Sequence, residues 1–254
     1  MNRVQRIKEF WNERARQYGA NQEATLGEIA VKCLEINEIN RHLDHGQKIL
    51  DVGCGNGYTT KIFAKKYYSK LHGIDYSPEM IRMAKQSLIE TEILGEIHFE
   101  MQDCLDLKFP NNYFDVIYTE RCIQNLPELK LQEKAILELI RVLKPGGKLI
   151  LIECSKTGLL QLNKIRKMIG RKAIDDAEPW HNKFFDDNWL IEFAHKDKDI
   201  FKLEINHFAS TYTLFTRILP LWRIFYYFRY FHYFPNIGEF GYFKSFMILK
   251  STDK

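Results

Sequence analysis

Three glycines at alternate positions follow an acidic residue in the stretch KILDVGCGNGYTT, residues 48–60. The acid is Asp51, and the glycines are Gly53, Gly55 and Gly57. Because ordered glycine costs backbone entropy, this spacing predicts a turn that other residues cannot form. The apolar run before the turn predicts a buried strand, and a helix signal follows it. A strand, a glycine turn and a helix together bring bare N–H groups and a positive helix end to a ligand.

Two further acids narrow the class of ligand. Asp75 ends the second predicted strand, and Asp103 ends the third and is followed by Cys104. The dinucleotide fingerprint needs a glycine five residues after Gly53, where this chain has Tyr58, which disfavours an NAD site. A carboxylate at the end of the second strand can accept both ribose hydroxyls of an adenosine. Acids here would repel phosphates and favour an adenosine that carries a cationic sulfonium and an ammonium group.

Alternating strands and helices must position these residues. Strands are predicted at 49–52, 71–75, 97–103, 113–119 and 148–154. Helical spacing of apolar residues over 128–143 predicts a helix that Lys144-Pro145-Gly146-Gly147 ends. Strands this apolar, alternating with helices, indicate a parallel sheet covered on both faces. Ligands of such sheets bind at the carboxyl ends of the strands, where the strand order reverses.

The remaining chain predicts additions to this core within one structural domain. The expected parts are an N-terminal helical cap at 1–47, the cofactor-binding core at 48–154, a helical lid insert at 155–200, and C-terminal strands with an aromatic segment at 201–254. The last part holds predicted strands at 201–211 and 244–251, separated by the aromatic segment 212–243. That segment has three readings: a cap over the acceptor pocket, a dimer interface or ordinary core, or a surface that rests on a membrane.

Composition limits the function classes. The chain has 254 residues and a net charge of only +4, which argues against a dedicated nucleic-acid binder. The charged N-terminus does not resemble a signal peptide, and no apolar run is long enough to predict a spanning helix. The five scattered cysteines indicate neither a disulfide framework nor a metal site. A reducing, cytoplasmic location is expected.

Four motifs in order resemble the class I S-adenosylmethionine-dependent methyltransferases. They are DVGCGNG, GIDYSPEMI, QDCLDLKFPNNYFDVIYTE and RVLKPGGKLILIE, within a likeness that covers roughly residues 10–155. The resemblance implies a Rossmann-like α/β fold with a seven-stranded, mostly parallel sheet whose last strand is antiparallel. It also implies S-adenosylmethionine as cofactor and S-adenosylhomocysteine as product.

Cofactor contacts follow from the same resemblance. Asp51 and the three glycines would line the methionine part, and Asp75 would take the ribose hydroxyls. Tyr76 and Met80 would lie near the adenine, and Asp103 would meet its amino group with Cys104 beside it. Glu120 would lie where the backbone touches the cofactor amino group, and Tyr18 would close over its carboxylate.

Polar residues on the expected acceptor side are the catalytic candidates: Glu120, Arg121, Gln124, Glu153 and His181. Many family members have a histidine after the fourth strand, where this chain has Gln124-Asn125. Arg121 suits either an ion pair or an anionic acceptor. Methyl transfer needs in-line positioning above all, and a base only where the acceptor must lose a proton.

The expected acceptor is a small molecule, and the expected state is a monomer or homodimer. The leading hypothesis is methylation of an oxygen on a sugar, nucleotide-linked or phosphate-derived precursor of a bacterial surface polysaccharide. One alternative is C- or O-methylation of a lipid, quinone-like or natural-product acceptor. The alternative of another class is a non-catalytic partner protein with the same fold.

Overall fold

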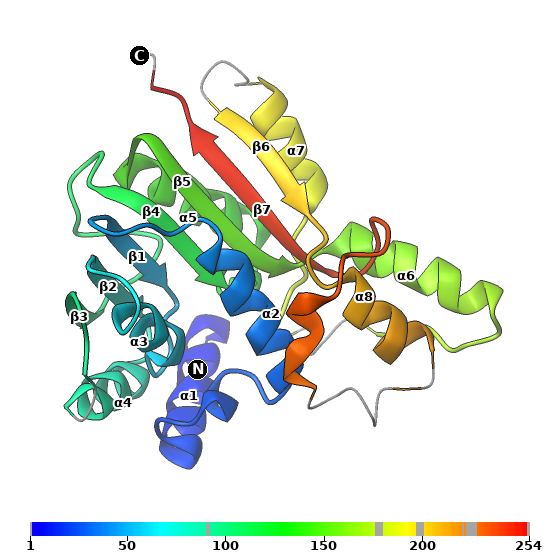
Figure 1. The fold of residues 1–254 in the computed structure, drawn as a ribbon, viewed down its shortest axis with the longest axis horizontal. Helices are drawn as coiled ribbons and strands as arrows, with labels where there is room; N and C mark the ends of the chain where they lie inside the picture. Colours follow the sequence, from blue (N-terminus) through cyan, green and yellow to red (C-terminus); the bar gives the residue numbers. More distant parts are fainter. Residues whose placement is uncertain are drawn as a thin grey trace.

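A single seven-stranded sheet forms the centre of this computed structural model, with the order β3-β2-β1-β4-β5-β7-β6. The structure describes residues 2–89, 92–175, 180–196, 201–219, 221 and 228–252. The strands are β1 (Lys48–Val52), β2 (Lys70–Asp75), β3 (Glu96–Met101), β4 (Phe114–Glu120), β5 (Leu143–Cys154), β6 (Phe201–Asn206) and β7 (Phe243–Lys250). β7 runs antiparallel to both β5 and β6, which confirms the expected mostly parallel sheet with an antiparallel last strand (Figure 1).

Helices cover both faces of the sheet and one of its ends (Figure 1). The longer ones are α1 (Arg3–Tyr18), α2 (Ile29–Asn40), α3 (Tyr58–Ala64), α4 (Pro78–Leu88), α5 (Leu129–Val142), α6 (Lys156–Met168) and α7 (Asp187–Lys196). Short helical turns are η1 (Gln22–Ala24), η2 (Ile123–Asn125), α8 (Ser210–Thr213), η3 (Leu214–Ile218) and η4 (Arg229–Tyr233). None of the helices in the described ranges is long and apolar enough to cross a bilayer.

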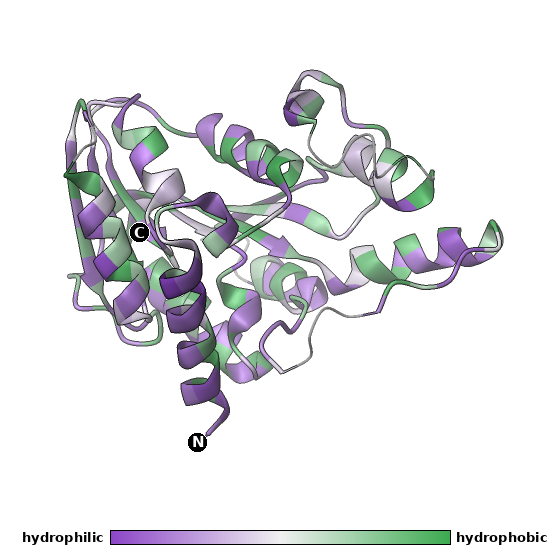
Figure 2. Cartoon of the chain, turned by 90° about the horizontal axis from the view of Figure 1, so that it is seen from below, coloured by the Kyte–Doolittle hydropathy of each residue, from purple (hydrophilic) through white to green (hydrophobic). Residues whose placement is uncertain are grey.

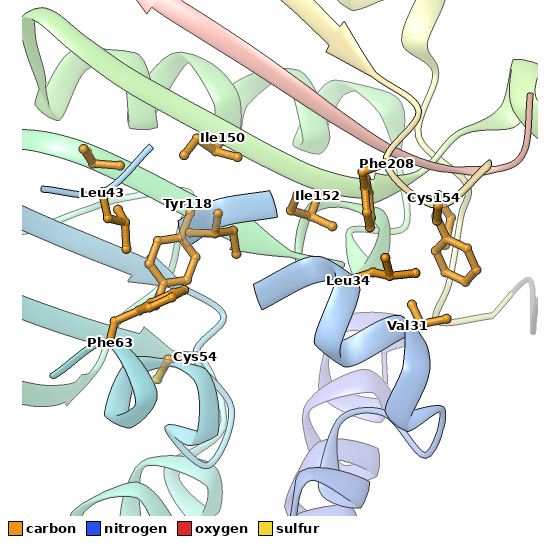
Figure 3. Close-up of a cluster of buried hydrophobic side chains, with 14 of the residues drawn as sticks. Val31, Leu34, Leu43, Cys54, Phe63, Tyr118, Ile150, Ile152, Cys154 and Phe208 are labelled. Carbon is orange, nitrogen blue, oxygen red and sulfur yellow. The ribbon is translucent and has the colours of Figure 1, made fainter. Parts of the chain in front are cut away.

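Alternation along the strands divides the buried side chains into two clusters. On one face, Tyr118 of β4 packs with Phe63 of α3, while Leu34 of α2 lies against the end of β5 (Figure 3). On the other face, the strands pack against α5 and α7 through residues such as Ile136 and Leu190. Successive side chains of a strand point to opposite faces, so each strand supplies both clusters.

Two strand boundaries differ from the predicted ones. The strand predicted at 148–154 begins at Leu143, directly after α5, and a register shift between Phe114 and Val116 takes up the Lys-Pro-Gly-Gly stretch. The strand predicted at 201–211 ends at Asn206. The chain leaves the sheet there because Phe208 and the residues after it are buried in the α2 cluster instead.

The aromatic segment 212–243 packs largely as core where it is described. Tyr212 and Phe231 join the cluster that contains α2, and their rings meet edge to face at 5.1 Å. The Tyr212 hydroxyl donates to Glu28 at 2.8 Å, and Arg217 pairs with the same carboxylate. The described residues of this segment are absent from the cavity lining given below, and residues 220 and 222–227 lie outside the described ranges.

Candidate active site

A cavity of about 310 Å³ opens at the carboxyl ends of β1, β2 and β4, where the strand order reverses. Its floor is the turn after β1, and its sides come from the loops after β2, β3 and β4. Helix α1 and residues 181–182 close it from above the strand ends. A cavity at this position is the usual ligand site of an open α/β sheet.

The glycine turn has the left-handed backbone that its sequence predicts. The φ angles of Gly53, Gly55 and Gly57 are 74°, 54° and 72°. A Cβ on Gly55 would lie 2.6 Å from the Thr25 side chain, so that position lacks room as well as favouring positive φ. The N–H of Gly55 donates to Asp75 at 2.9 Å, which fixes the turn against the end of β2.

Asp75 and Asp103 face the cavity from neighbouring strand ends. Asp75 accepts hydrogen bonds from two backbone N–H groups, those of Gly55 at 2.9 Å and Ser77 at 2.8 Å. Burial raises the pKa of Asp75 to about 6, and these backbone donors partly oppose the rise. Asp103 accepts from the N–H of Leu105 at 2.9 Å. Each carboxylate keeps lone pairs that face the cavity side of its loop.

Two buried ion pairs join α2 to the end of β4. Lys32 lies 2.9 Å from Glu120, and the side chains are 4% and 7% exposed. Arg121 donates to Glu35 at 2.8 Å and to the Thr25 carbonyl at 3.3 Å. Arg121 also has a φ of 56°, an uncommon value for a residue with a side chain. Its guanidinium is therefore held by the protein, in agreement with the ion-pair reading of this residue.

Asp51 and Glu153 lie behind the cavity wall rather than in it. Asp51 accepts from the hydroxyls of Thr60 at 2.6 Å and Tyr118 at 2.8 Å. Glu153 accepts from Thr119 at 2.8 Å and from two backbone N–H groups at the start of η2. Burial raises the pKa of each carboxyl to about 7. Their contacts are those of groups that shape the strand ends supporting the site.

Gln124 connects the β4 loop to the segment that closes the cavity. Its side-chain amide donates to Asn182, and its side-chain oxygen accepts from the N–H of Cys154 at 2.7 Å. The neighbouring His181 reaches the cavity from the same segment. The His181 ring lies 4.5 Å from that of Phe10 and 4.2 Å from that of Trp180. Gln124 thus holds the segment that presents His181.

Helix α1 supplies the apolar wall. Ile7, Phe10 and Trp11 face the cavity from one side of this helix, together with Val4, Lys8 and Arg14. Leu126 and Leu131 face it from the chain that follows β4. The part of the cavity beyond the strand ends is therefore lined mainly by aliphatic and aromatic groups.

Four buried polar atoms in the wall have no hydrogen-bond partner among the described residues: Asn56 Oδ1, Thr59 Oγ1, Gln102 Nε2 and Glu120 Oε1. Buried polar atoms are almost always paired in native proteins, so these point to a ligand. The wall also carries the carboxylates of Asp75, Asp103 and Glu120, whereas its cation Lys32 is already paired. The donor set fits a polar, cationic cofactor with hydroxyl and amino groups.

The structure brings most of the predicted site residues to one cavity. Those that line it are Gly53, Gly55, Asp75, Tyr76, Met80, Asp103, Cys104, Glu120, Arg121, Gln124 and His181. Those that do not are Tyr18, Asp51, Gly57 and Glu153. Gly57 begins α3, and Tyr18 packs in a small cluster with Met80.

Sequence reasoning missed Lys32, Gln102 and the apolar face of α1. The spacing of Ile7, Phe10 and Trp11 on one side of α1 was the available signal for that wall. Lys32 carried no local signal, because its partner Glu120 is 88 residues away.

Comparisons with known proteins agree with this geometry. Residues 50–151 match the family model described as a methyltransferase domain. The chain is 36% identical over 122 residues to a ubiquinone/menaquinone biosynthesis C-methyltransferase, UbiE, of Vibrio cholerae, which covers 47% of this chain and 46% of that protein. A UbiE of Yersinia pestis is 34% identical over 145 residues, covering 53% and 57%. The chain spans about half the length of the curated relatives it matches.

Solved structures share the fold at low identity. A SAM-dependent methyltransferase from Methanosarcina mazei has a TM-score of 0.55 at 22% identity, covering 85% of this chain and 98% of that one. A phosphoethanolamine N-methyltransferase from Haemonchus contortus, solved with phosphoethanolamine and S-adenosylhomocysteine, has a TM-score of 0.64 at 16% identity, covering 98% and 49%. The domain match, the shared fold and the ordered site motifs together show that this chain belongs to the class I S-adenosylmethionine-dependent methyltransferases.

Proposed function

We propose that this protein transfers a methyl group from S-adenosylmethionine to an apolar, quinone-like aromatic acceptor. The observation that carries the proposal is the wall formed by Ile7, Phe10 and Trp11 with Leu126 and Leu131. A sugar or nucleotide acceptor would need many hydrogen-bond partners, and this wall offers few. The similarity to UbiE proteins supports the same acceptor class over a polysaccharide precursor.

The polar half of the cavity would hold the cofactor. Asp75 would accept from ribose hydroxyls, and Asp103 would accept from the adenine amino group. The unpaired Oε1 of Glu120 would accept from the cofactor ammonium group, while its other oxygen stays on Lys32. S-adenosylmethionine supplies, when bound, an electrophilic methyl on a sulfonium. The glycine turn leaves room for the backbone to approach this ligand closely.

The apolar half would orient the acceptor and exclude water. A hydroquinone-type ring carbon becomes a stronger nucleophile when a ring hydroxyl loses its proton. His181 is the candidate that would take this proton, because its imidazole lies in the cavity wall among the rings of Phe10, Trp11 and Trp180. Base catalysis of this kind contributes about 100- to 10,000-fold, and positioning contributes more.

Calorimetry and a product assay test the proposal in two steps. Titration with S-adenosylhomocysteine and with NAD should give binding of the first alone. Release of S-adenosylhomocysteine is then measured with a prenylated hydroquinone and with a nucleotide sugar as competing acceptors, and mass spectrometry locates the added methyl. Methylation of the hydroquinone supports the proposal. Methylation of the sugar alone refutes the acceptor class, and binding of cofactor without any methylated product from either acceptor refutes it as well.

A further inference from the structure

Helix α6 projects beyond the end of the sheet and ends in a strongly basic turn (Figure 1). We call residues 164–172, KIRKMIGRK, the α6 tip. It contains five cations and no acid, in a chain whose net charge is only +4. Gly170, with a φ of 73°, turns the backbone there. Positive charge is therefore concentrated at one projecting point.

Apolar side chains are exposed at the same point. Met168 is 78% exposed and Ile169 is 51% exposed. Leu160, which is 62% exposed, lies two turns before Met168, with Lys164 between them at four-residue steps. Residues at this spacing share one face of a helix. Figure 2 shows hydrophobic and hydrophilic residues mixed along this projecting helix up to its end.

Hydrogen bonds fix the tip in this shape. The N–H of Arg171 donates to the Arg166 carbonyl at 2.7 Å, and the Arg166 side chain donates to the Lys172 carbonyl at 2.8 Å. Asn163 forms two hydrogen bonds of 2.8 Å with the backbone of Ile174. Burial and the neighbouring cations Arg171 and Arg217 lower the pKa of Arg166. The exposed Met168 and Ile169 are therefore held outward by an ordered turn.

The charges at the tip are available to a partner. Within the described ranges, no carboxylate forms an ion pair with Lys164, Lys167 or Lys172. A second copy of the chain would bring a like-charged tip, which disfavours self-association at this point. A nucleic acid would pair with the cations but would gain nothing from Met168 and Ile169. An anionic bilayer takes both, because its headgroups attract the lysines and its interface buries apolar side chains.

We propose that the α6 tip is a docking site for anionic lipid membranes. Lys164, Lys167 and Lys172 contact the headgroups, while Met168 and Ile169 enter the interface. This inference rests on the tip alone and not on the acceptor proposed above, so it is tested by binding without turnover.

Co-sedimentation with vesicles tests it. Wild-type protein should bind vesicles of equal parts phosphatidylcholine and phosphatidylglycerol, bind pure phosphatidylcholine weakly, and dissociate at high salt. Lys167→Gln with Lys172→Gln should lower the partition coefficient about fivefold for each cation removed. Met168→Ser with Ile169→Ser should lower it roughly tenfold or more.

Matched controls lie on α5. Lys130→Gln with Lys134→Gln makes the same charge change at exposed positions, and Leu137→Ser makes the same apolar change at a residue that is 50% exposed. These variants should bind vesicles like the wild type, and all variants should keep their affinity for S-adenosylhomocysteine. Absence of wild-type binding to anionic vesicles, or an equal loss in the α5 variants, overturns the proposal. Binding of a DNA or RNA duplex that depends on Lys167 and Lys172, without vesicle binding, makes the tip a nucleic-acid site and overturns it too.

Discussion

The Lys32–Glu120 pair allows a structural role and a ligand role of one carboxylate to be separated. Glu120→Gln removes the negative charge and leaves Lys32, 4% exposed, without its partner. Breaking a buried ion pair in this way costs about 3–5 kcal/mol of folding stability. The same substitution removes the charged oxygen proposed to accept from the cofactor ammonium group. A hydrogen bond to a charged group contributes about 1.5–3 kcal/mol, so the affinity for S-adenosylhomocysteine should fall about 10- to 150-fold.

The double variant distinguishes these two effects. Adding Lys32→Met to Glu120→Gln removes the unpaired buried cation, so most of the lost stability should return. The cofactor affinity should stay low, because Glu120 Oε1 is still missing from the cavity wall. Urea unfolding measures the first quantity, and calorimetric titration with S-adenosylhomocysteine measures the second. If the double variant regains both stability and affinity, Glu120 serves only to neutralise Lys32, and the assignment of its free oxygen to the cofactor is refuted.

Three further predictions concern the turn, the base and the buried acids. Gly55→Ala should weaken S-adenosylhomocysteine binding, since its Cβ would lie 2.6 Å from Thr25, and Thr25→Ser should restore part of the affinity by calorimetry; the cost of positive φ, about 1–2 kcal/mol, should remain in the pair, and full recovery would contradict the backbone argument. His181→Ala and His181→Phe should both lower turnover by about 100-fold or more and leave cofactor affinity nearly unchanged, and unchanged turnover in either would remove His181 from the mechanism. Asp51 and Glu153 hold their protons in the folded state up to a pKa of about 7, above their usual values of 3.8 and 4.5, so the stability that they contribute is complete below about pH 4 and is lost as the pH rises through 7. The midpoint of thermal unfolding, followed by calorimetry from pH 5 to 8.5, should therefore fall as pH rises and should fall less in Asp51→Asn, whereas a rising midpoint would oppose the assignment.

Local sequence was sufficient for the sheet and for the cofactor turn. The order of apolar runs predicted the strands, and the alternate glycines predicted positive φ at Gly53, Gly55 and Gly57, which all three have. The reason is that backbone conformation and strand burial depend on neighbouring residues. The acids Asp75 and Asp103 could likewise be placed at strand ends, because parallel strands bring those ends to one edge.

Only the tertiary structure decided what surrounds that turn. His181 meets Phe10 across 171 positions of the chain, Gln124 is fixed by Asn182, and Lys32 neutralises half of Glu120. Such contacts depend on how distant elements pack, and no spacing rule along the chain encodes them. The sequence by itself thus determined the fold and the cofactor class, while long-range packing decided which side chains are already paired and which remain to meet a ligand.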